Sequence, residues 1–155
     1  MSKAGPLDGD DNVARIATVR ASSSHAGSSP EGAVDGTVVG RPGDMSHEWV
    51  SQGESASAMI GLSWLDDQLV DRVWLFDRPN KIDQIMAGML IFSDGTIIKT
   101  GELPDDAGKG LEVKFTQKKI QWLIFAVEQT KGAAQHIGLS EIAVFGHDAR
   151  ERAGE

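Results

Sequence analysis

Residues 89–100 read MLIFSDGTIIKT, and this stretch decides the fold class of the chain. Two runs of β-prone residues flank the Asp94-Gly95 pair. Such a pair between two strands is a strong signal for a β-hairpin, because tight hairpin turns need the positive φ angles that Gly and Asp tolerate. The stretch therefore predicts an antiparallel hairpin with its turn at Ser93-Asp94-Gly95.

Short strand patterns continue on both sides of this hairpin. Residues 57–64 alternate, so that every second side chain from Ala58 to Trp64 shares one face, and residues 69–76 form the most apolar run of the chain. Further strand patterns cover residues 111–115, 122–127 and 138–146, whereas long amphipathic helices are missing. The spacing predicts an all-β sandwich of about eight strands and one domain.

The two ends of the chain lack this pattern. Residues 1–12 are rich in Gly, Asp and Pro, and residues 147–155 are charged, so we expect a flexible tail at each end of a sandwich that spans residues 13–146. The chain shows no apolar signal core, which leaves its localisation unknown: it is cytoplasmic or a piece of a longer secreted protein.

The composition of the chain limits the kinds of molecule that it is expected to bind. The 155 residues carry a net charge of −8, which disfavours nucleic acid and insertion into anionic membranes, and no apolar run approaches the roughly 20 residues of a membrane span. There is no cysteine, so disulfides and thiolate metal sites are excluded. Motifs of hydrolases, phosphate-binding loops and zinc proteases are also missing, and we expect no enzyme activity.

The order of several segments resembles the discoidin, or coagulation-factor type C, superfamily of galactose-binding-like sandwiches. These segments are Ala33-Val34-Asp35-Gly36, Glu48-Trp49-Val50-Ser51 and the closing run over residues 138–146. The middle of the chain resembles a branch of this superfamily that is often appended to carbohydrate-active enzymes. The sequence departs from the pattern at His47, where Thr or Ser is usual, and in having no tyrosine.

The resemblance implies a structural calcium ion. Asp35 and Glu141 would supply side-chain ligands, Gly32 and Thr37 backbone carbonyls, and Ser46 a ligand from the long loop. Such a mixture of carboxylate and carbonyl oxygens suits calcium. In the alternative interpretation, Asp35 caps a turn and Glu141 is a solvated strand residue.

A sugar site is implied next to the most apolar run. By position, Arg78 and His47 match residues that contact ligands in sugar-binding members of the superfamily. Asn80 and Asp83 lie in the same polar loop as Arg78, and their side chains offer the donors and acceptors that sugar hydroxyls use. In the alternative interpretation, Asp77 and Arg78 form a structural ion pair. The loop at His136 is then the next candidate for the sugar site.

These features favour a non-catalytic carbohydrate-binding module or small lectin whose partner is a glycan. The alternative is a protein-interaction or adhesion module on the same fold. A cluster of Arg78, His47 and Asn80 would favour sugar, whereas a buried salt bridge of Arg78 would favour the alternative. The sequence does not set the oligomeric state. All four tryptophans, at positions 49, 64, 74 and 122, are expected in the core.

Overall fold

The computed structural model describes residues 11–36, 48–53, 56–78, 84–104, 109–131 and 137–149, which hold seven antiparallel strands and two short 3-10 helices. In chain order the elements are η1 (Val13–Ile16), β1 (Thr18–Ala21), η2 (Pro30–Val34), β2 (Trp49–Val50), β3 (Met59–Asp77), β4 (Ile85–Phe92), β5 (Ile97–Thr100), β6 (Leu111–Thr130) and β7 (Gly138–Asp148). The expected all-β sandwich is confirmed.

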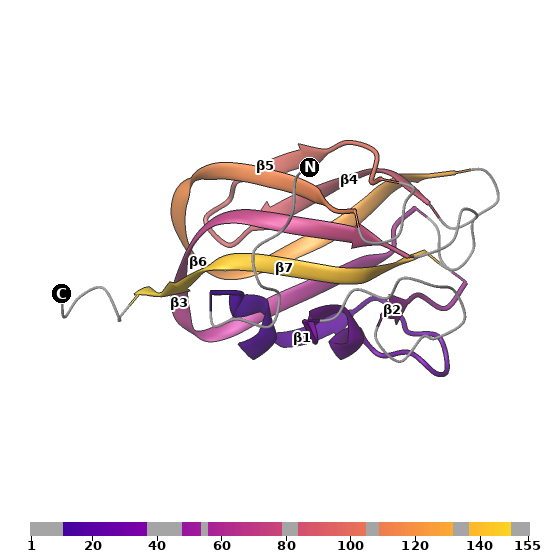
Figure 1. Ribbon diagram of the computed structural model, residues 1–155, viewed down its shortest axis with the longest axis horizontal. Helices are drawn as coiled ribbons and strands as arrows, with labels where there is room; N and C mark the ends of the chain where they lie inside the picture. Colours follow the sequence, from indigo (N-terminus) through magenta and orange to yellow (C-terminus); the bar gives the residue numbers. More distant parts are fainter. Residues whose placement is uncertain are drawn as a thin grey trace.

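Two long strands join the two layers of this sandwich. The first half of β3 pairs with β1 and with the second half of β6, and the second half of β3 pairs with β7 and with the first half of β6. A register shift between Ser63 and Gln68 marks the bend of β3 between the layers. Figure 1 shows both long strands turning over at one end of the molecule. The patterns at residues 57–64 and 69–76 therefore belong to one bent strand.

We call the two layers by their strands. The five-stranded layer holds β1, the first half of β3, the second half of β6, β4 and β5, and the four-stranded layer holds β2, β7 and the other halves of β3 and β6. The predicted hairpin is confirmed as β4 and β5. Gly95 has a φ of +92°, and its amide donates to the carbonyl of Phe92 at 2.9 Å.

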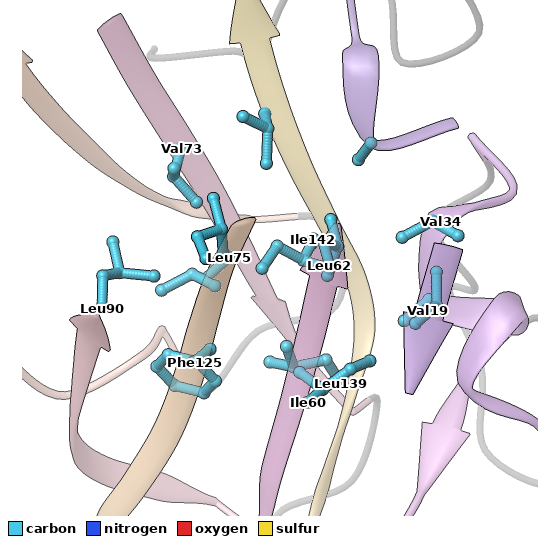
Figure 2. Packing of buried hydrophobic residues seen from close by; sticks show 14 of the residues in the cluster. Val19, Val34, Ile60, Leu62, Val73, Leu75, Leu90, Phe125, Leu139 and Ile142 are labelled. Carbon is cyan, nitrogen blue, oxygen red and sulfur yellow. The ribbon is translucent and has the colours of Figure 1, made fainter. Parts of the chain in front are cut away.

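The core lies between the layers. The alternating side chains from Ala58, directly before β3, to Trp64 are all buried, as the pattern predicts. They meet Phe125 of β6, Leu90 of β4 and Leu139 and Ile142 of β7, and Val19 and Val34 close the core near η2 (Figure 2). No helix of the described residues is long and apolar enough to cross a membrane.

Three expectations need correction. The ordered sandwich is wider than residues 13–146, because Asn12 is buried and accepts from the amides of Ala14 and Val144, and because β7 continues to Asp148. Ser29-Pro30 is a sequence that predicts a helix start with Ser29 as the N-cap, and η2 does begin at Pro30, but the Ser29 side chain makes no capping hydrogen bond. Trp122 is not a core residue, because its side chain points outward from β6 and is 39% exposed.

Candidate functional site

Several segments converge at one end of the sandwich, which we call the loop end. Asp77, the last residue of β3, pairs with Leu139 at the start of β7, and Leu139 in turn pairs with Trp49 of β2. The amide of Ile85, the first residue of β4, donates to the Asp77 side chain. The residues that flank these strand ends, Glu48, Arg78 and Gln84, therefore lie at the same end.

A buried ion pair lies at this end. The Arg78 Nε donates to Glu48 Oε1 at 3.1 Å, and the side chains are 11% and 1% exposed. A charge this deeply buried is costly unless it has a partner, so the pair fixes both groups in place. Among the described residues, the ion-pair partner of Arg78 is Glu48 and not Asp77, which corrects the alternative interpretation above.

Asp77 has a different role, because it holds the backbone. Its Oδ1 accepts from the amide of Arg78 at 2.8 Å, and its Oδ2 accepts from the amide of Ile85 at 2.9 Å. One carboxylate thus joins the end of β3 to the first residue of β4. This anchoring gives Arg78 a rigid base, since charge-assisted bonds to backbone amides are among the stronger hydrogen bonds.

Two further carboxylates meet where η2 ends beside β7. Asp35 is the C-cap of η2, and the amide of the next residue, Gly36, donates to Glu141 Oε2 at 2.9 Å. Glu141 is fully buried, and its Oε1 has no hydrogen-bond partner in the described part of the chain. Burial raises the pKa of Glu141 to about 9, the Asp35 carboxyl adds to this rise, and the Gly36 amide opposes it.

These groups fit a hard cation. Asp35, three residues beyond Gly32 of η2, lies beside Glu141, whose Oε1 is buried without a partner in the described part of the chain. Calcium takes such a mixture of carboxylate and carbonyl oxygens. Within the described ranges, no group of three or more His, Cys, Asp or Glu side chains could hold a metal, so carbonyls would have to complete the shell.

The structure describes only some of the predicted site residues. It brings Asp35 and Glu141 together, keeps Gly32 in the neighbouring turn and places Arg78 at the loop end. The other predicted residues lie outside the described residues; these are Thr37, Ser46, His47, Asn80, Asp83 and His136. Sequence reasoning missed Glu48 as a site residue. A charged residue directly before two buried strand residues, Trp49 and Val50, was the available signal.

Solved structures with this fold include carbohydrate-binding proteins. The family 32 carbohydrate-binding module of C. perfringens NanJ, in complex with galactose, is 13% identical over 86% of this chain and 96% of that chain, with a TM-score of 0.66. The lectin domain of lectinolysin, complexed with Lewis B antigen, is 22% identical over 88% and 96%, with a TM-score of 0.67. A fucolectin from striped bass (Morone saxatilis) serum is 14% identical over 89% and 49%, with a TM-score of 0.74.

At these identities the likeness establishes the fold, a galactose-binding-like sandwich of the discoidin type. No curated protein sequence matches the chain. A family described as a domain of unknown function (DUF7402) matches residues 12–145. The chain therefore belongs to this family.

Proposed function

We propose that this member of the DUF7402 family is a non-catalytic carbohydrate-binding module or small lectin that binds a glycan at the loop end. The observation that carries the proposal is the position of Arg78 at the loop end, where Asp77 anchors the ends of β3 and β4 beside it. Loops on a rigid scaffold are where sandwiches place their ligand sites. The sugar-binding proteins of the same fold support a glycan as the ligand.

The chemistry of the pair suits sugar hydroxyls. A guanidinium has five N–H donors in a planar fork, and the bond to Glu48 uses one of them while fixing the plane. A weak sugar site gains from such preorganisation, because little binding free energy remains for ordering flexible side chains. His47, Asn80 and Asp83 would complete the site in this proposal.

A structural calcium ion is the second part of the proposal. Asp35 and Glu141 would hold it with the carbonyls of Gly32 and Thr37 and with Ser46. The ion would neutralise two neighbouring carboxylates and tie the end of η2 to β7. Since η2 also packs against the backbone of Glu48 through Gly32, the ion would stabilise the segment that carries the pair.

One observation favours a second function, a protein-interaction or adhesion module on the same fold. The pair of Arg78 with Glu48 is buried, and buried pairs often serve structure rather than binding. In that case Arg78 would support the loop end, and the partner would be a protein.

A glycan array with the full chain, run with calcium and with chelator, tests the proposal. The proposal expects a defined set of glycans to bind and expects Arg78→Lys to lose that set while remaining folded. Binding to no glycan, in either condition, would contradict it and favour the interaction module.

A further inference from the structure

A groove crosses the outer face of the five-stranded layer, away from the pair of Arg78 and Glu48. Two adjoining hollows form it, and both are lined by Arg20, Gly61 and Ile124. One end of the groove continues to Trp122, and the other end continues to Met59. Residues Arg20, Gly61 and Ile124 are cross-strand neighbours on β1, β3 and β6, so they lie in one row across the layer.

Gly61 creates the hollow. A Cβ at this position would lie 3.4 Å from Cγ1 of Ile124 and 3.8 Å from the carbonyl oxygen of Leu123, in ordinary contact, and so would occupy part of the space. The backbone does not need glycine here, because Gly61 is not among the described glycines with positive φ. Glycine in a strand interior weakens the strand and often marks a place where a ligand approaches closely.

Trp122 forms one wall and is available to a ligand. The indole N–H groups of Trp49 and Trp64 donate to backbone carbonyls at 2.8 Å, whereas that of Trp122 has no partner among the described residues. Its side chain is 39% exposed. An aromatic ring with a free N–H suits a pyranose, which has an apolar C–H face and a rim of hydroxyls.

Arg20 sets the charge of the groove. Its side chain is exposed, and no acidic side chain of the described residues pairs with it, although the whole chain has 23 acidic against 15 basic residues. The lining residues of both hollows include no carboxylate. A guanidinium in such a place is complementary to a carboxylate, which it can bind through two parallel hydrogen bonds.

The groove is too small for a protein partner or a second copy of this chain. Among the residues that line the groove, Met59 and Trp122 are the only large apolar ones that are more than a third exposed, at 41% and 39%. Each exposes on the order of 100 Å². A stable protein interface buries about 800 Å² on each side.

We propose that this groove is a second binding site, for an acidic saccharide whose ring face packs on Trp122 and whose carboxylate pairs with Arg20. The site is independent of the glycan site proposed at the loop end. Thr18 and Ser63, which form the next cross-strand row with Trp122, would offer hydroxyls to the same ligand.

The test follows the indole N–H signal of Trp122 in a 1H–15N spectrum of the full chain, assigned with Trp122→Phe. The probes are trigalacturonate, an alginate trimer and a hyaluronan tetrasaccharide, each beside its methyl ester, which removes only the charge. At least one acid should shift the signal saturably. Its ester and the exposed-site variant Arg20→Gln should each weaken binding about tenfold or more, since each removes a charge-assisted bond.

Two further variants locate the ligand. Gly61→Val should fill the groove and abolish the shift, and the smaller Gly61→Ala keeps the test valid if the valine variant does not fold. Arg78→Lys should leave the shift intact, and its loss in that variant would place the acid at the loop end and overturn only this second site. The proposal would also be overturned if none of the acidic saccharides binds, or if a methyl ester binds as tightly as its acid. A Trp122 signal that shifts with protein concentration and not with saccharide concentration would overturn it as well.

Discussion

Gly32 of η2 packs directly against the backbone of Glu48. A Cβ on Gly32 would lie 2.8 Å from both the amide nitrogen and the carbonyl oxygen of Glu48, closer than real side chains approach. The turn that leads to Asp35 therefore touches the residue that holds Arg78. This contact links the two candidate sites, the carboxylate pair and the ion pair, through a single point of packing.

Gly32→Ala tests this contact. The added methyl must push the backbone of Glu48 away, so we expect the free energy of unfolding to fall by about 1–3 kcal/mol and glycan affinity at the loop end to fall with it. Urea denaturation and calorimetric titration measure the two effects. Gly101→Ala is the matched control, because a Cβ there would meet nothing within 4 Å. Equal behaviour of the two variants would show that the contact is not needed.

The ion pair predicts strong non-additivity. Arg78→Ala leaves the Glu48 carboxylate buried without its partner, and we expect a loss of about 3–5 kcal/mol in unfolding free energy. Adding Glu48→Ala should recover part of this loss, because the uncompensated charge is then gone. A double-mutant cycle by urea denaturation measures the coupling. Additive losses would contradict a direct interaction between the two charges.

Asp77→Asn tests the anchor of the loop end. An amide has one acceptor oxygen, so one of the backbone amides of Arg78 and Ile85 would lose its partner and face an N–H₂ group instead. We expect a loss of about 1–3 kcal/mol in unfolding free energy. Asp67→Asn, at an exposed position in the bend of β3, is the control and should change stability by under about 0.5 kcal/mol. A loss at Asp77 no larger than at Asp67 would remove the anchor from the account.

Much of the fold follows from local patterns. The hairpin turn at Asp94-Gly95 and the alternation from Ala58 to Trp64 are short-range signals, and both are confirmed. By contrast, local patterns do not reveal that β3 and β6 are each one long strand that bends from one layer into the other. That continuity depends on which strands pair. Trp122 was misplaced for a related reason. The run from Trp122 to Val127 is apolar on both faces, so its sequence does not reveal that Leu123 and Phe125 face inward.

The candidate site was less predictable. Asp35 and Glu141 are 106 positions apart, and a resemblance to a family, rather than spacing, brought them together. Glu48 was missed because a buried charge is unusual, and its partner Arg78 is 30 residues away in the chain. Burial depends on tertiary packing, which a single sequence does not display.

Glu141 predicts a pH dependence that calcium should remove. Its folded pKa of about 9 is above the ordinary value of 4.5, so the folded state holds an extra proton between these values. The contribution of this proton to the free energy of unfolding is complete below pH 4.5 and is lost as the pH rises toward 9. The free energy of unfolding then falls by up to about 1.4 kcal/mol per pH unit. Saturating calcium, which binds the carboxylate form, should flatten this part of the slope.

Denaturation series at several pH values, with chelator and with calcium, measure this effect. Glu141→Gln should lose both the slope assigned to Glu141 and the response to calcium, whereas Glu112→Gln, on the surface of β6, should keep both. Identical curves with calcium and with chelator for the unaltered chain would exclude a calcium ion that exchanges under these conditions, and elemental analysis would then decide whether one is trapped.

The most direct measurement of the central claim is calorimetric titration of Arg78→Lys with a glycan that binds the unaltered chain, beside urea denaturation of the same variant. Lysine can keep the charge next to Glu48 but lacks the planar fork, so we predict an affinity about tenfold lower or more and a stability within about 1 kcal/mol. Arg72→Lys, a matched change on the four-stranded layer, should leave affinity unchanged. Unchanged affinity in Arg78→Lys together with a large loss of stability would contradict the account and make Arg78 a structural residue.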